Sequence, residues 1–140
     1  MVITAGAAQG GRPLIKYMDK ILAIDDETTM TDFYEDLFSG AGYEIKTAAD
    51  ATAGMDMYYD FKPDLLVLDA DMPGGGGERV FGISRTLLNS DIPIVFITGL
   101  PERVAKLALT NSNVRVYQKP VDTNDLLSTV KEMIKARKSK

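Results

Sequence analysis

Short aliphatic runs alternate with segments of helical periodicity along most of the chain. Residues 21–24, 65–68 and 92–97 are nearly continuous aliphatic runs, which is typical of strands that are covered on both faces. Two runs of more mixed composition, residues 43–48 and 114–117, fit strands at the edges of a sheet. The pattern therefore predicts five strands.

Five amphipathic segments lie between and after these strands. Thr28/Thr29, Asp50 and Asp122 are suitable caps for the first, second and fifth helices, and Pro101 suits the first turn of the fourth. The expected core-facing stripes are Met30, Phe33, Tyr34, Leu37 and Phe38; Ala51, Gly54, Met55 and Tyr58; Val80, Ile83, Ser84, Leu87 and Leu88; Val104, Leu107 and Ala108; and Leu126, Leu127, Val130, Met133 and Ile134.

Strands that alternate with helices predict an α/β fold with a parallel sheet and helices on both sides, because parallel crossovers need a helix. At 140 residues the chain should form one domain. Residues 1–17 are rich in glycine and alanine and suggest a flexible lead-in, which an expression vector could have supplied. The domain is expected at residues 18–140.

Polar side chains follow four of the five predicted strands. Asp25, Asp26 and Glu27 follow the first, Asp69 the third, Thr98 the fourth and Lys119 the fifth. The carboxyl ends of parallel strands share one rim, where α/β proteins place their sites. Carboxylates gathered there would repel one another without a cation, and Mg²⁺ is the expected occupant because it prefers oxygen ligands and keeps several waters.

Composition removes several classes of site. The chain has no cysteine and no histidine, which excludes thiolate catalysis, serine-histidine triads and imidazole metal sites. The net charge of −4 argues against direct nucleic-acid binding. No apolar stretch is long enough to span a membrane, so a cytoplasmic location is expected.

Four segments, "ILAIDDE", "LLVLDADMPGGGG", "IPIVFITG" and "VYQKP", resemble in order and spacing the receiver domain of two-component response regulators. The resemblance covers about residues 20–137. It implies a flavodoxin-like three-layer sandwich with a five-stranded parallel sheet in the order 2-1-3-4-5 and five helices. It also implies a single-domain phosphoprotein of signal transduction that is not a classical enzyme but catalyses its own phosphorylation and dephosphorylation.

The resemblance assigns roles by position. Asp69 matches the phosphoacceptor, Thr98 and Lys119 the groups that bind the phosphoryl group, and Tyr117 an aromatic residue that moves with Thr98. The implied Mg²⁺ ligands are Asp25, through water, Asp26, Asp69 and the backbone carbonyl of Asp71. A cis peptide is implied between Lys119 and Pro120. The implied partners are a histidine kinase or phosphotransfer protein, and a separate downstream protein that reads residues 101–136.

Two other functions stay open at this point. A receiver-like binding module would work without phosphorylation. A haloacid-dehalogenase-type phosphatase would use Asp69 as nucleophile and Asp71 as acid, but that motif should occupy the first strand rather than the third. The glycine run 74–77 is not a phosphate-cradling loop, because it continues into Glu78-Arg79 rather than Gly-Lys-Ser/Thr.

Overall fold

The computed structural model describes residues 2–4, 14–73 and 75–139 of the chain. Its main sheet has five parallel strands, β3 (Lys20–Ile24), β4 (Glu44–Ala48), β5 (Leu65–Leu68), β6 (Ile94–Thr98) and β7 (Val114–Gln118). The strands lie in the order β4-β3-β5-β6-β7. Taken in chain order this is 2-1-3-4-5, as the sequence predicts, with the two mixed strands at the edges.

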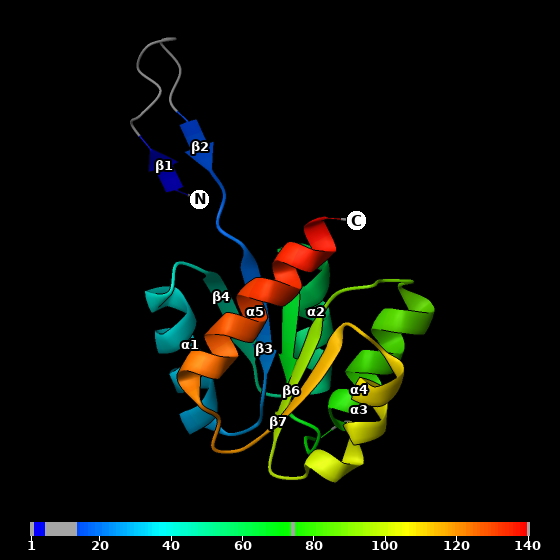
Figure 1. Cartoon of the computed structure of the whole chain (residues 1–140). Coiled ribbons are helices and arrows are strands. Elements are labelled where there is room, and N and C mark those ends of the chain that lie inside the picture. The colour runs from blue at the N-terminus through cyan, green and yellow to red at the C-terminus, as the bar shows by residue number, and fades with distance from the viewer. Residues whose placement is uncertain (1, 5–13, 74, 140) are drawn as a thin grey trace.

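Helices cover both faces of the sheet (Figure 1). They are α1 (Thr28–Gly40), α2 (Ala51–Phe61), α3 (Gly76–Gly82), which continues into a π-helical turn η2 (Ile83–Leu87), a 3₁₀ turn η3 (Pro101–Arg103), α4 (Ala105–Thr110) and α5 (Thr123–Lys138). Alternate strand residues enter two separate cores, because successive side chains point to opposite faces. Ile21 and Val67 pack with α1 and α5, whereas Leu22 and Leu68 pack with α2, α3 and Val104.

Three predicted helices differ in detail from the structure. The Thr28/Thr29 cap is wrong, because the N-cap of α1 is Glu27, whose side chain makes no capping hydrogen bond. The third helix starts at Gly76 and, where the stripe predicts an ordinary α-helix, changes to π geometry, with Leu88 N–H donating to Ile83 O. Pro101 opens the 3₁₀ turn η3 instead of an α-helix.

Two short strands precede the main sheet. β1 (Val2–Thr4) and β2 (Leu14–Lys16) pair antiparallel and lie beyond the end of the sheet where the strands begin (Figure 1). Both strands fall within the lead-in predicted for residues 1–17, of which residues 1 and 5–13 lie outside the described part. Among the described residues, no helix combines the length and the apolar character that crossing a membrane requires.

Candidate functional site

The register of the sheet brings the polar strand ends to one rim. Ile24 pairs with both Ala48 and Leu68, and Thr98 pairs with Gln118. The next residues therefore leave the sheet together at the lower end of the molecule in Figure 1, opposite β1 and β2. Asp26, Glu27, Asp69, Asp71, Gly99, Leu100 and Lys119 line a cavity of about 270 Å³ at this rim.

Lys119 is the centre of the charge arrangement. Its Nζ lies 2.6 Å from Glu27 Oε1, 2.9 Å from Asp25 Oδ2 and 3.2 Å from Asp69 Oδ2. Burial alone would lower the pKa of Lys119, but hydrogen bonding to Glu27 and the charges of Asp25 and Asp69 raise it above its usual value. Lys119 therefore stays protonated and holds three carboxylates together. The Lys119–Pro120 peptide is cis.

Asp25 is the most deeply buried of these acids, with 1% of its surface exposed. Its Oδ1 accepts a hydrogen bond from the backbone N–H of Glu27 at 2.9 Å. Its buried Oδ2 has no hydrogen bond and faces Lys119 only as an ion pair. Burial raises the pKa of Asp25, although the Glu27 N–H and Lys119 oppose the rise. The ionised form is thus costly here and would gain from a further cation.

Asp69 follows the central strand β5 and is 4% exposed. Its Oδ1 accepts a hydrogen bond from Asp71 N–H at 3.2 Å, while Oδ2 faces Lys119. Its backbone carbonyl accepts a hydrogen bond from Gly77 N–H at 2.9 Å. A Cβ at Gly77 would lie 2.6 Å from that carbonyl oxygen and 2.8 Å from the Phe96 ring, so α3 can start this close to Asp69 only with glycine there.

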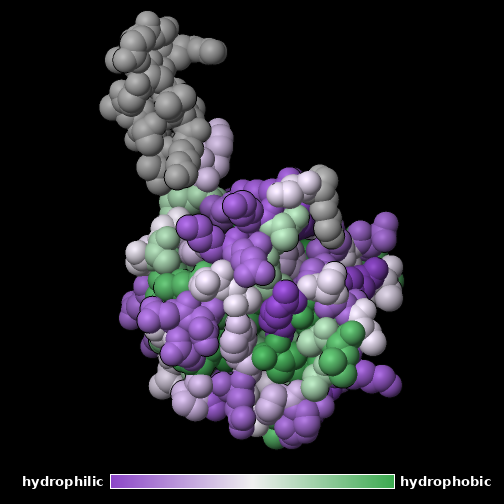
Figure 2. Space-filling view, in the orientation of Figure 1, coloured by the Kyte–Doolittle hydropathy of each residue, from purple (hydrophilic) through white to green (hydrophobic). Residues whose placement is uncertain are grey.

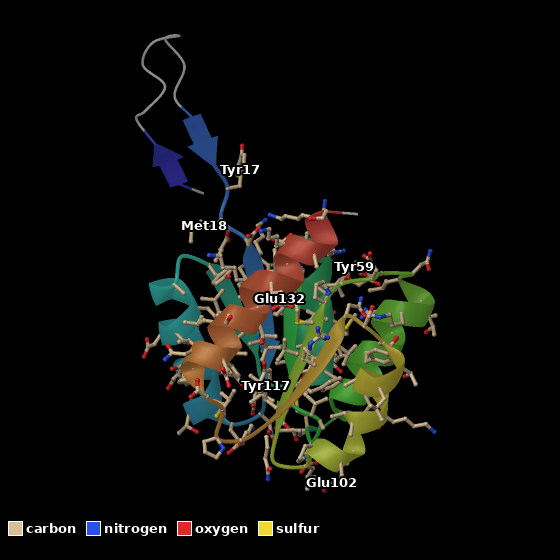
Figure 3. The ribbon with its side chains drawn as sticks, viewed as in Figure 1. Tyr17, Met18, Tyr59, Glu102, Tyr117 and Glu132 are labelled. Atoms are coloured by element: carbon tan, nitrogen blue, oxygen red, sulfur yellow. The ribbon has the colours of Figure 1, made fainter. Side chains whose placement is uncertain are left out.

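The two remaining positions named by the sequence do not reach the cavity. Thr98 is fully buried, and its hydroxyl accepts a hydrogen bond from Leu100 N–H at 3.0 Å. Tyr117 is partly buried, and its hydroxyl lies 2.5 Å from the Thr129 hydroxyl on α5 (labelled Tyr117 in Figure 3). Thr98 therefore marks the start of a loop whose next residues, Gly99 and Leu100, line the cavity.

The acidic residues could hold a hard divalent cation. One carboxylate oxygen from each of Asp25, Glu27 and Asp69 lies within 4.8 Å of the others. All three ligand atoms are oxygens, which suits Mg²⁺, and the buried Asp25 Oδ2 without a hydrogen bond is an acceptor for it. The group differs from the sequence expectation, because Glu27 belongs to it and the exposed Asp26 lines the cavity instead.

Two ion-pairing residues received no role from the sequence. Glu27 was placed at the strand end, but its contact with Lys119, 92 positions away, depends on the tertiary fold. Arg103 on η3 lies 3.5 Å from Asp71 Oδ1 and 2.7 Å from Glu78 Oε1. The sequence around Arg103 gives no local signal for this bridge, since Asp71 lies on the loop after β5 and Glu78 on α3.

Comparison with known proteins agrees with the geometry. The model of the response regulator receiver domain matches residues 21–131. A curated relative, the DNA-binding dual master transcriptional regulator RpaA of Synechocystis sp., is 29% identical over 120 residues, 84% of this chain and 50% of the relative. The chain thus spans half the length of that relative.

Solved structures show the same fold. A receiver domain protein (CheY-like) from Methanospirillum hungatei superposes with a TM-score of 0.78 at 23% identity, covering 88% of this chain and 98% of that one. A putative response regulator from Chloroflexus aurantiacus superposes with a TM-score of 0.74 at 28% identity, covering 84% of this chain and 98% of that one.

Proposed function

Because this chain belongs to the response regulator receiver family, we propose that Asp69 accepts a phosphoryl group and that the resulting charge switches a surface for partner binding. The observation that carries the proposal is the buried Asp69 carboxylate held 3.2 Å from Lys119 at an acidic rim. Lys119 and the Asp71 N–H hold the two oxygens of this carboxylate in place, and Asp69 lines the cavity. The carboxylate can therefore act as a nucleophile toward a group that enters the cavity.

In the proposed reaction, an Asp69 carboxylate oxygen attacks phosphorus while the bond from phosphorus to the donor breaks. The donor in the cell is a phosphohistidine on a histidine kinase or a phosphotransfer protein, and its imidazole is the leaving group. Transfer of this kind depends on positioning and on neutralising the phosphoryl oxygens. Lys119 supplies a positive charge at Asp69, and its raised pKa keeps it charged throughout.

Asp25, Glu27 and Asp69 would hold Mg²⁺, with Asp26 and the Asp71 carbonyl as the further ligands expected from the sequence. When bound, the ion would neutralise phosphoryl charge. Each of two loops orients one of these acids. Asp25 Oδ1 accepts a hydrogen bond from Glu27 N–H, and Asp69 Oδ1 accepts one from Asp71 N–H.

The proposed switch starts at Thr98. A phosphoryl group on Asp69 would attract the Thr98 hydroxyl, and movement of that hydroxyl toward Asp69 would draw it away from Leu100 N–H, whose hydrogen bond it accepts. Loss of that bond frees the loop that leads into η3 and α4. Tyr117, now bonded to Thr129 on α5, lies on the adjacent strand and would change position with Thr98.

The surface that would change is formed by α4, β7 and α5. Figure 2 shows hydrophobic side chains gathered where Figure 1 places α4 and β7, beside the hydrophilic surface over α5. Leu109 on α4 is 85% exposed, whereas Leu107 on α4 and Val116 on β7 are partly buried against the core. A separate protein that pairs an apolar contact with acidic groups would match this face.

Intact mass measurement tests the phosphorylation. The protein is incubated with acetyl phosphate and Mg²⁺, and we expect a gain of one phosphoryl group. Asp69→Asn and a chelator should each abolish the gain, whereas Asp56→Asn, which removes an exposed carboxylate on α2, should not. A wild-type protein that gains no mass would refute the proposal.

The same assay separates the two alternatives. A phosphatase would hydrolyse p-nitrophenyl phosphate repeatedly and would lose this activity on Asp71→Asn. A binding module would neither gain a phosphoryl group nor hydrolyse p-nitrophenyl phosphate, and it would still bind its partner. The site does not favour a phosphatase, because the Asp71 carboxylate that would act as its acid is 71% exposed and paired with Arg103.

A further inference from the structure

We propose that Arg103 is a positioning residue that pairs with Asp71 and offsets its negative charge at the mouth of the phosphoacceptor cavity. This inference rests on the proposed phosphorylation of Asp69. It concerns which donors Asp69 can use and how fast.

The cavity mouth is strongly acidic. Four of its lining residues are carboxylates, Asp26, Glu27, Asp69 and Asp71, and only Lys119 among them is a cation. Lys119 is already shared by Asp25, Glu27 and Asp69. Asp71 therefore depends on a cation from outside this group, and an unpaired Asp71 would repel an anionic phosphodonor.

Arg103 is that cation. One guanidinium nitrogen lies 3.5 Å from Asp71 Oδ1 and the other 2.7 Å from Glu78 Oε1. The planar fork of arginine can contact two carboxylates at once, which a lysine ammonium does less well. Arg103 thus spans the stretch from the loop after Asp69 to the start of α3.

The backbone places Arg103 for this contact. Pro101 begins η3, and Arg103 N–H donates to Leu100 O at 3.1 Å. Figure 3 shows Glu102, the preceding residue, at the same end of the molecule as the strand ends. At the start of α3, Gly76 has φ +69, and a Cβ there would lie 2.1 Å from Ala70 O and 4.0 Å from the Arg103 guanidinium. The glycine brings the acidic loop close to η3.

The bridge is too exposed to serve chiefly for stability. The Arg103, Asp71 and Glu78 side chains are 40%, 71% and 41% exposed, and such pairs contribute little to folding. Their charges nevertheless act on an ion that enters the cavity, because Asp71 lines it. The effect should therefore appear in phosphorylation rate and weaken as salt screens the charges.

Rates of phosphorylation test the inference in four proteins, namely wild type, Arg103→Gln, Asp71→Asn and the double variant. At low salt with acetyl phosphate, a dianion, we expect phosphorylation of Arg103→Gln to be several-fold slower. The slowing should appear as a higher donor concentration for the half-maximal rate, with the maximal rate unchanged. The loss should shrink at high salt and be smaller with phosphoramidate, a monoanion. It should be smaller in the Asp71→Asn background, where Arg103 no longer holds a charged carboxylate at the cavity mouth.

Two variants control for folding. Arg137→Gln breaks a comparable surface pair, with Asp91 at 3.2 Å, far from the cavity, and should not slow the reaction. Arg103→Lys keeps the charge and should retain most of the wild-type rate even if Arg103→Gln is poorly folded. An equal loss from Arg103→Gln with and without Asp71, or a loss independent of salt, would overturn the inference. A wild-type protein that is not phosphorylated would instead contradict the proposed function.

Discussion

At the scale of single residues, the acidic site affects the pKa of a tyrosine in the core. Tyr34 on α1 is 1% exposed, and its hydroxyl has no hydrogen-bond partner among the described residues. Burial raises the pKa of Tyr34 above its usual range, and the negative charges of Asp25, Asp69 and Glu27 raise it further. The hydroxyl therefore stays neutral in the fold, beneath the acids of the rim.

The raised Tyr34 pKa predicts a specific loss of stability in alkali. The unfolded tyrosine ionises at about pH 10 whereas the folded one does not, so stability falls as pH rises above about 10, by up to about 1.4 kcal/mol per pH unit. Tyr34→Phe should lose stability less steeply there and be no less stable at pH 7, since its hydroxyl has no partner. Urea unfolding at pH 7 and pH 11 measures both. Tyr17→Phe, at a site 72% exposed, should follow wild type; a Tyr34→Phe curve parallel to wild type would contradict the reasoning.

The glycine beside Asp69 gives a second prediction at this scale. Gly77→Ala places a methyl group 2.6 Å from Asp69 O and against Phe96, so the loop or the helix must move. We expect a loss of about 1–3 kcal/mol of unfolding free energy, which is usual for overpacking, together with slower phosphorylation. Gly40→Ala is the control, because nothing lies within 4 Å of its added Cβ on α1. Equal unfolding free energies for the two variants would show that the close approach at Gly77 is not real.

At the scale of elements, the caps separate what local sequence decides from what the tertiary fold decides. Asp50 accepts a hydrogen bond from Ala53 N–H and Asp122 one from Asp125 N–H, both as predicted, because these bonds span only three residues. The first helix is different. Glu27 occupies its N-cap position, and its carboxylate pairs with Lys119 instead of capping.

Substitution at the two positions should show this difference. Asp122→Ala removes a capping bond from α5 and should cost about 1 kcal/mol, read from chemical denaturation. Thr28→Ala, at the position the sequence suggested as a cap, should change stability by much less, because the structure shows no capping bond there. A larger loss from Thr28→Ala than from Asp122→Ala would show that the helix starts where the sequence placed it.

The same distinction decides how much of the site the sequence could predict. Both edge strands and the gathering of Asp25, Asp69 and Lys119 follow from aliphatic runs and from residues that directly follow them. The strand order is implied by the family resemblance and not by the pattern itself. The inclusion of Glu27 in the acidic cluster and the Arg103 bridge could not be predicted, since each joins loops far apart in sequence. The π turn after Gly82 also has no signal in the hydrophobic pattern, which fits an ordinary helix equally well.

At the scale of the whole molecule, a well-packed fold carries an unfavourable rim. The two cores are made of apolar side chains from the five strands of the main sheet and from the helices on each of its faces. The rim concentrates Asp25, Glu27 and Asp69 around Lys119, and burial of Asp25 raises its pKa, so its charge opposes folding at neutral pH. That part of the cost declines as pH falls and the carboxyl becomes neutral. The buried Asp25 charge therefore lowers stability at the site where the proposed phosphorylation needs it.

Bound Mg²⁺ should offset this cost, because a ligand that binds only the folded state raises its stability. We expect the melting temperature of the Mg²⁺-free protein to rise by several degrees in millimolar Mg²⁺, beyond the change in a NaCl solution of equal ionic strength. Asp25→Asn removes the buried charge and should melt higher than wild type without Mg²⁺, yet respond less to the ion. Asp56→Asn, exposed on α2, should respond as wild type does. If Asp25→Asn instead melted lower in chelator, the Asp25–Lys119 pair would outweigh the burial of the charge, and the rim would be a source of stability.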